Sequence, residues 1–325
     1  MITVEHLTKR YGSVTAVDDI SFTLETGHIY GFLGPNGAGK STTMNIMTGC
    51  LAASAGEVTI DGHDIFEDAR QAKRLIGYLP EIPPLYTDET PWEYLCFVAQ
   101  AKGIPAKQIP DEVARAVAET RLDEMAGRLI RNLSKGYRQR VGIAQALLGS
   151  PPYIILDEPT VGLDPLQIIE IRDLIRQLGE KHTVILSSHI LSEVQAICES
   201  VLIIAHGKLV AFDTPQNLEK MLTAAGRMTL CAEATPDQVQ GLLAGVSQVT
   251  GCQAREDEAA GGCRAELTLQ GDANAAARAI FLAFAKAGRP ILQMTPVRAD
   301  LENIFIELTE DEPSGKKEPI HESGI

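Results

Sequence analysis

The sequence predicts an α/β protein with a parallel core sheet, followed by a smaller α+β domain. Three observations indicate this fold class. Short apolar runs alternate with helical stretches up to about residue 222, a glycine-rich turn joins one buried strand to a helix, and the pattern changes after residue 228. Strands of a parallel sheet are covered by helices on both faces, so they are continuously apolar. We therefore expect one domain over residues 1–222 and an accessory domain over 228–309.

The first part of the chain is expected to form an antiparallel β subdomain and the start of the core. The predicted strands are Val4–Leu7, Val14–Val17, Ser21–Leu24 and the buried run His28–Leu33. Lys40–Thr48 is predicted to be a helix, because Gly49 follows it and glycine commonly ends helices. Glu57–Ile60 and the tight turn at Asp61-Gly62 indicate a hairpin.

The middle of the chain is predicted to be a helical subdomain, after which strands and helices alternate again. The helical part covers about residues 87–149. The later elements are strand Tyr153–Leu156, helix Leu166–Leu178, strand Thr183–Ser187, helix Leu191–Cys198, and a hairpin of Val201–Ala205 with Leu209–Phe212. This alternation is typical of a parallel α/β core.

The accessory domain is predicted to have the order β-α-β-β-α-β, which suggests a ferredoxin-like domain. Its elements are Met228–Ala234, Pro236–Leu243, Val246–Arg255, Arg264–Leu269, Asp272–Ala287 and Pro290–Arg298, followed by a helix at Leu301–Leu308. Asp272 is expected to cap its helix, and Gly288 lies just past the end. Residues 310–325 are polar with two prolines, so we expect a disordered tail.

Composition narrows the classes of protein. The formal net charge is −14, which argues against nucleic-acid binding and against direct adsorption to an anionic membrane. No run of about 18 apolar residues predicts a membrane-spanning helix, and the N-terminal segment does not resemble a signal peptide, so we expect a cytoplasmic protein. None of the six cysteines forms a C-x-x-C motif, which favours free thiols over a zinc site.

The run Gly34–Ser41, GPNGAGKS, is the strongest functional signal, because it matches the P-loop pattern between a buried strand and a helix. Backbone N–H groups of such a turn point at phosphates, and the helix dipole adds favourable potential. Lys40 is expected to reach the β- and γ-phosphates and Ser41 to bind Mg²⁺. The predicted nucleotide contacts from this segment are Gly34, Asn36, Gly37, Gly39, Lys40, Ser41 and, at the α-phosphate, Thr42.

A second signal is YIILDEP, an apolar strand over Tyr153–Leu156 that ends in two acids. An Asp at the carboxyl end of a strand beside a P-loop can hold the Mg²⁺ shell, which we assign to Asp157. Glu158 is then placed to orient or deprotonate the attacking water.

Further motifs follow the order found in one family. LSKGYRQR at Leu133–Arg140 matches LSGGQ at Leu133, Ser134 and Gly136, VGLDP contains Asp164, and SSHIL contains His189. With these motifs the chain resembles the ATP-binding cassette (ABC) family over residues 1–222.

The resemblance implies that two cassettes enclose two ATP molecules between them. Ser134 and Gly136 would contact the γ-phosphate bound to the opposite subunit, Asp164 would belong to the D-loop, and His189 would contact γ-phosphate and water. Tyr11 lies where the family stacks an aromatic ring on adenine, although it can also simply pack.

Two positions depart from the family pattern. Lys135 and Tyr137 replace the second Gly and the Gln of LSGGQ, and Glu81 in IGYLPE stands where many members have Gln. This variant resembles the ATPases of two-component exporters, whose permease is a separate chain. In the family the segment after Glu81 lines a groove for a permease helix. Its aromatics Tyr86, Trp92 and Tyr94 can equally pack within the helical subdomain.

These observations predict an ATPase subunit that uses ATP and Mg²⁺ to drive an exporter. The expected partners are a transmembrane permease and a second ATPase subunit, most simply in a homodimer, at the inner face of the cell membrane. A soluble ABC ATPase without a transport role and a nucleotide-gated regulatory module remain the alternatives. Intact Asp157, Glu158 and His189 favour hydrolysis.

Overall fold

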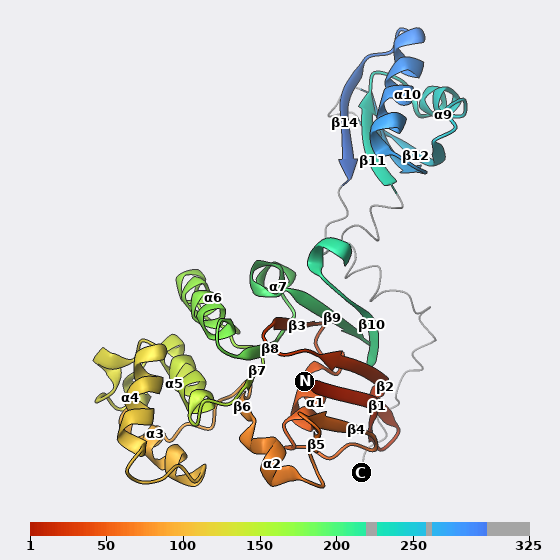
Figure 1. Ribbon diagram of the computed structural model, residues 1–325. Coiled ribbons are helices and arrows are strands. Elements are labelled where there is room, and N and C mark those ends of the chain that lie inside the picture. The colour runs from red at the N-terminus through yellow and green to blue at the C-terminus, as the bar shows by residue number, and fades with distance from the viewer. Residues whose placement is uncertain (219–225, 258–261, 298–325) are drawn as a thin grey trace, which may run out of the picture. The chain divides into compact units, whose positions relative to one another are not determined.

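The computed structural model describes residues 1–218, 226–257 and 262–297 and divides into two compact units. The N-terminal unit contains Met1–Pro215, and the C-terminal unit lies within Gln216–Glu307 (Figure 1). Within the described residues, no helix is long and hydrophobic enough to cross a bilayer.

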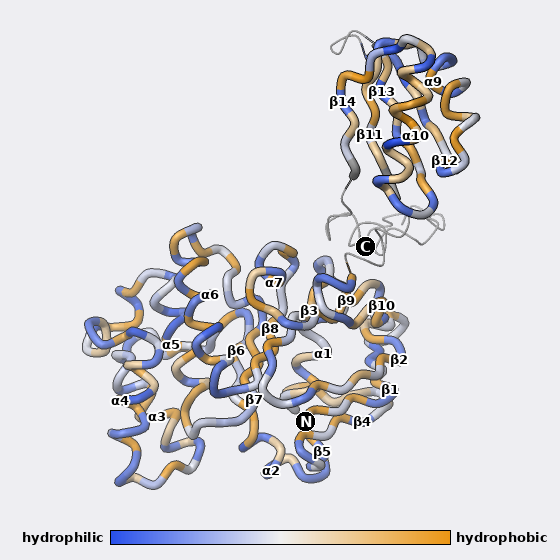
Figure 2. Tube along the Cα trace, turned by 45° about the horizontal axis from the view of Figure 1, so that its top comes forward, coloured by the Kyte–Doolittle hydropathy of each residue, from blue (hydrophilic) through white to orange (hydrophobic). Residues whose placement is uncertain are grey.

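The core of the N-terminal unit is a six-stranded sheet of order β10-β9-β3-β8-β7-β6. Its strands are β3 (Ile29–Leu33), β6 (Ile76–Leu79), β7 (Tyr153–Leu156), β8 (Thr183–Ser188), β9 (Ser200–Ala205) and β10 (Lys208–Asp213). All neighbours are parallel except β9 and β10, which form the predicted hairpin. Every residue of β3, β7 and β8 is buried, as continuous apolar runs predict, and Figure 2 shows these central strands as largely apolar. The parallel α/β core is therefore confirmed.

A second, antiparallel sheet of order β2-β1-β4-β5 adjoins this core. Its strands are β1 (Ile2–Tyr11), β2 (Val14–Leu24), β4 (Ala55–Ile60) and β5 (His63–Asp64). The break predicted between Val17 and Ser21 is wrong, because both segments belong to the continuous strand β2. Pairing with β1 shifts register along its length, and Asp19 adopts a left-handed φ of 52°, so β2 is irregular but continuous.

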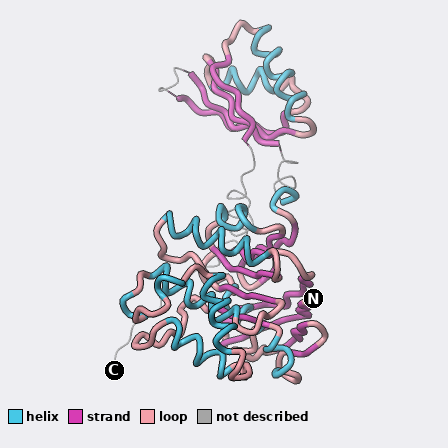
Figure 3. Tube along the Cα trace, turned by 60° about the vertical axis from the view of Figure 1, so that its left-hand side comes forward, coloured by secondary structure: helices cyan, strands magenta, loops and turns pink. Residues whose placement is uncertain are grey.

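Helices pack beside the sheets of this unit (Figure 3). Next to the strands lie α1 (Lys40–Met47), α2 (Ala69–Arg74), α6 (Pro165–Gly179) and α7 (Leu191–Ile197). The predicted helical subdomain consists of α3 (Pro91–Ala101), α4 (Ile109–Glu119) and α5 (Lys135–Leu147), with 3₁₀ turns at Asp123–Met125 and Ile130–Asn132. α3, α4 and α5 pack on one another to one side of the sheets (Figure 1).

The C-terminal unit has one four-stranded antiparallel sheet of order β12-β13-β11-β14. Its elements are β11 (Gly226–Ala232), α9 (Pro236–Leu243), β12 (Val249–Asp257), β13 (Gly262–Leu269), α10 (Ala273–Lys286) and β14 (Ile291–Val297). Asp272 accepts hydrogen bonds from the backbone N–H groups of Asn274 and Ala275, so it caps α10 as expected. The predicted helix Leu301–Leu308 and the tail 310–325 lie outside the described residues, and the ferredoxin-like class stays a prediction.

Candidate functional site

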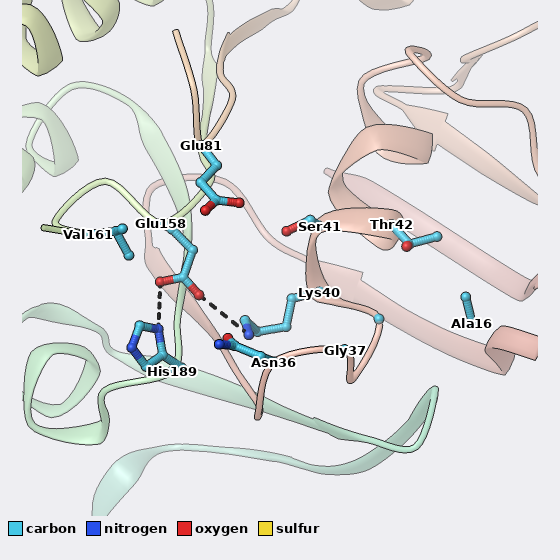
Figure 4. A pocket seen from close by; sticks show the side chains of 11 residues that line it. Ala16, Asn36, Gly37, Lys40, Ser41, Thr42, Glu81, Glu158, Val161 and His189 are labelled. Carbon is cyan, nitrogen blue, oxygen red and sulfur yellow. Dashed lines mark hydrogen bonds and ion pairs between the residues drawn. The ribbon is translucent and has the colours of Figure 1, made fainter.

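A pocket of about 350 Å³ lies where β3, β7 and β8 end and their loops begin (Figure 4). Carboxyl ends of parallel strands meet at one edge of a sheet, which is where α/β proteins bind ligands. The lining residues are Ala16, Asn36, Gly37, Gly39, Lys40, Ser41, Thr42, Glu81, Glu158, Val161 and His189. Nine of these eleven, all except Ala16 and Val161, belong to the set predicted from the sequence.

The glycine-rich turn brings the backbone close to the pocket. Gly37 and Gly39 have φ values of +82° and +108°, which side-chain-bearing residues rarely adopt. A Cβ at Gly39 would also lie 2.5 Å from the carbonyl oxygen of Ala16. α1 starts directly afterwards at Lys40, so its N-terminal end faces the pocket and favours an anion there.

Lys40 provides a buried positive charge at the base of the pocket. Its Nζ donates to the carbonyl oxygens of Gly34 at 2.8 Å and Pro35 at 3.2 Å. The same Nζ lies 3.4 Å from Oε1 of Glu158. Gly34 thus contributes its carbonyl to the position of Lys40, although it does not line the pocket itself.

The Glu158 carboxylate is held between two groups, as Figure 4 shows. Oε1 faces Lys40, and Oε2 lies 2.9 Å from Nδ1 of His189. Its side chain is only 7% exposed, so the charge is shielded from water. The backbone at Glu158 is left-handed, with φ of 46°, a strain of about 1–3 kcal/mol that proteins retain mainly at functional sites.

Asp157 lies just below the pocket surface and is buried. Its Oδ1 accepts hydrogen bonds from the hydroxyls of Ser41 at 3.1 Å and Ser187 at 2.6 Å. A carboxylate beside a serine hydroxyl is the oxygen donor set that Mg²⁺ prefers. The two predicted metal ligands, Ser41 and Asp157, are therefore adjacent.

Four other predicted residues lie elsewhere. Tyr11 is half exposed, with Nζ of Lys9 at 5.1 Å from its ring centre. Ser134 caps α5 by accepting from the backbone N–H of Tyr137, and Asp164 caps α6 in the same way. The remaining residue, Gly136, is buried against α6. None of the four lines this pocket.

Sequence reasoning missed Ser187 and Glu193. Ser187 donates to Asp157, and it accepts a hydrogen bond from the backbone N–H of Glu158 at 2.7 Å. The buried Glu193 carboxylate accepts from the hydroxyls of Thr160 at 2.6 Å and Ser188 at 3.0 Å. Ser187 could have been found as a polar residue at the end of a buried strand. Nothing in the sequence around Glu193 indicated that its carboxylate is buried.

The aromatic residues after Glu81 divide between packing and exposure. Tyr94 is buried, and burial raises its pKa to about 12. The ring centres of Tyr86 lie 5.7 Å from Tyr94 and 5.3 Å from Phe97, while Tyr86 itself is half exposed. Trp92 is 38% exposed. Tyr86, Tyr94 and Phe97 therefore form one aromatic cluster with a buried side and an open side.

Comparisons with known proteins extend these observations. A family model described as "ABC transporter" matches residues 17–161. The bacitracin transport ATP-binding protein BcrA of Bacillus licheniformis is 42% identical over 212 residues, which cover 65% of this chain and 68% of BcrA. The lipopolysaccharide export system ATP-binding protein LptB of Escherichia coli (strain K12) is 35% identical over 221 residues, 67% of this chain and 92% of LptB.

A solved structure of an ABC transporter cassette also matches this chain. The dimeric MJ0796, described as a bacterial ABC transporter cassette, matches with a TM-score of 0.60 at 25% identity. The match covers 66% of this chain and 98% of that chain. The same cassette has been solved in a post-hydrolysis state bound to ADP and Pi.

Proposed function

The chain belongs to the ABC transporter family, and we propose that it binds and hydrolyses Mg-ATP to drive an exporter whose permease is a separate chain. Similarity to BcrA and LptB, which are named for bacitracin transport and lipopolysaccharide export, supports the export role. The permease would hold the chain at the inner face of the membrane. The proposed domain limits are 1–222 for the ATPase and 228–309 for the accessory domain.

The observation that carries the proposal is the Glu158 carboxylate between Lys40 and His189 in a pocket bordered by the P-loop. A carboxylate at this position can accept a proton from water that attacks the γ-phosphate. Lys40 would stabilise negative charge on the phosphates, and His189 would orient Glu158 and the phosphate. Glu81 lines the same pocket and offers an oxygen to water or metal.

The residues present fit a magnesium ion. Ser41 and Asp157 would hold Mg²⁺, since their oxygens lie 3.1 Å apart at the start of α1 and the end of β7. When bound, the ion would neutralise charge on the β- and γ-phosphate oxygens. Ser187 keeps the Asp157 carboxylate in place through its hydroxyl.

We also propose that the working unit is a dimer of ATPase subunits. In that arrangement Ser134, Gly136 and Asp164 would face the ATP of the other subunit. Their position at the starts of α5 and α6, outside the pocket of their own chain, is compatible with this role. The dimeric structure of MJ0796 supports it by similarity.

The test is Glu158→Gln, which keeps the side-chain shape and removes the base. We expect ATP binding to persist and turnover to fall about 10²–10⁴-fold, the usual contribution of a general base. Size-exclusion chromatography with ATP should then show a trapped dimer. The matched control is Glu180→Gln, an exposed acid at the end of α6. Hydrolysis by Glu158→Gln at the wild-type rate would refute the assignment.

A second measurement separates transport from a soluble ATPase. A tagged chain expressed in its native host should co-purify with the membrane fraction and be released by detergent together with a permease. A chain found only in the soluble fraction, with full ATPase activity, would contradict the transport role and leave the ATPase assignment intact.

A further inference from the structure

A second cavity of the N-terminal unit is lined by positive charge. It has a volume of about 640 Å³ and shares no lining residue with the nucleotide pocket. Arg70, Lys73, Arg74 and Lys102 line it, and none of its described lining residues is acidic. The rest of the wall is small or apolar, including Ile76, Ile104 and Leu148. We call this cavity the basic cavity.

Three of the four cations come from the single short helix α2. Arg70 and Arg74 are four positions apart, and Arg70 and Lys73 are three apart, so all three share one face. Like charges at these spacings destabilise a helix by about 0.2–0.5 kcal/mol per pair. The helix dipole favours Lys73 and Arg74 in the last turn but not Arg70. A bound anion would offset this repulsion.

No described carboxylate neutralises the charges of the basic cavity. Within the described residues, none of the four cations has a carboxylate oxygen within 4.0 Å. The chain has 43 acidic and 29 basic residues, so acids are not scarce. A cluster of unpaired cations in an acidic protein therefore needs an explanation at this position.

Two of the ammonium groups are fixed by backbone carbonyls. Lys73 donates to the carbonyl oxygen of Gly49 at 2.9 Å. Lys102 donates to the carbonyl oxygens of Gln145 at 2.9 Å and Leu148 at 3.0 Å, at the end of α5. These contacts hold the charges in place without cancelling them. Arg70 and Arg74 also line the cavity, and both residues are exposed.

We propose that the basic cavity binds a phosphate-bearing ligand of small-molecule size. The guanidinium group of an arginine can donate two hydrogen bonds to the oxygens of one phosphate, and the ammonium group of a lysine adds a positive charge. The volume falls within the range of about 300–1,000 Å³ that is typical of small-molecule sites. The apolar wall can cover the carbon part of such a ligand. The phosphate can belong to a free phosphorylated molecule or to a lipid headgroup, and the net charge of −14 favours the free anion.

The direct test is calorimetric titration of the full chain with pyrophosphate, while a non-hydrolysable ATP analogue saturates the nucleotide pocket. We compare the wild type with the double variant Arg70→Gln/Arg74→Gln. The matched control is Arg128→Gln/Arg278→Gln, which removes two exposed arginines outside the cavity and gives the same net charge. We expect wild type and control to bind alike and the double variant to bind at least tenfold more weakly.

A parallel arm distinguishes the source of the phosphate. Co-sedimentation with phosphatidylcholine vesicles, with and without phosphatidylglycerol, should show no dependence on Arg70 and Arg74 if the ligand is a free anion. Arginine-dependent binding to the phosphatidylglycerol vesicles would instead assign the phosphate to a lipid.

The proposal is overturned if neither probe binds the wild type, or if the double variant binds both probes as tightly as the wild type. Circular dichroism checks that the variants fold, and Arg74→Gln alone replaces the double variant if that one does not. The outcome is independent of ATP hydrolysis, because no residue of the basic cavity lines the nucleotide pocket.

Discussion

Glu193 is predicted to hold together the two loops that carry the proposed catalytic groups. Its carboxylate accepts from Thr160, two residues after Glu158, and from Ser188, directly before His189. The Glu193 side chain is 3% exposed, and Nη2 of Arg172 lies 3.7 Å from its Oε1. Glu193→Ala should therefore lower stability and also displace the pair that faces the proposed γ-phosphate.

The magnitude follows from what the substitution leaves behind. Each buried hydroxyl that loses its acceptor costs about 1–3 kcal/mol. The Ser188 hydroxyl can still donate to the carbonyl oxygen of Ile190 at 3.4 Å, so the cost at Ser188 lies at the low end of this range. The Thr160 hydroxyl loses its acceptor at 2.6 Å. Arg172 is partly exposed and adds little. We expect the unfolding free energy to fall by about 3 kcal/mol, and by about 1 kcal/mol for Glu193→Gln, which keeps one acceptor oxygen.

Urea unfolding measures the stability change. Trp92 is the single tryptophan and lies in α3, so its fluorescence reports the N-terminal unit alone. Steady-state ATPase kinetics measure the second effect. A misplacement of reacting groups by about 1 Å costs up to about 10²-fold in rate. We expect kcat to fall about 10–100-fold with KM for ATP nearly unchanged, because Glu193 does not contact the P-loop.

Glu67→Ala is the matched control, since Glu67 is exposed and its carboxylate takes part in no ion pair among the described residues. An unchanged urea midpoint for Glu193→Ala would refute the energetic reasoning. A stability loss with wild-type kcat would show that Glu193 is structural only, and recovery of kcat in Glu193→Gln would support positioning.

Two further predictions concern groups around the nucleotide. Ser187→Ala leaves the buried N–H of Glu158 without its acceptor. It should lower the free energy of unfolding in urea by about 1–3 kcal/mol and reduce kcat. The control Ser192→Ala, on the exposed side of α7, should change stability by less than about 0.5 kcal/mol. Equal midpoints for both variants would contradict this. Tyr11→Ala should weaken ATP binding, measured by calorimetry, by about 1 kcal/mol if the ring stacks on adenine, and Tyr11→Trp should restore it. Unchanged affinity in Tyr11→Ala would mean that the ring only packs.

The parts of the site that the sequence predicted are those set by local pattern. The strand, turn and helix around Gly34–Ser41, and the acids that follow β7, each depend on residues a few positions apart. These segments meet because the carboxyl ends of parallel strands lie at the same edge of the sheet. His189 was assigned through the family resemblance, and in the structure it directly follows the buried strand β8.

The parts that were missed depend on contacts between distant segments. Ser187 contacts Glu158 across 29 positions, and Glu193 contacts Thr160 across 33. The strand β6 was also missed, since it has only four residues and contains Gly77. A Cβ there would lie 2.1 Å from the carbonyl oxygen of Ala146, so the glycine permits close packing of α5. Local propensity cannot reveal such a requirement.

Ser134 shows how a capping residue and a ligand contact can coexist. Its hydroxyl oxygen accepts from the backbone N–H of Tyr137 at 3.4 Å, a long bond that uses one lone pair. A serine hydroxyl retains its proton as a donor, so it can cap α5 and still donate to a phosphate beyond the helix. Asp164 caps α6 with an acceptor-only carboxylate, which would repel a phosphate. If a second subunit supplies ATP to this face, Ser134 is therefore the group expected to contact its phosphate, and Asp164 is expected to act on neighbouring backbone or water.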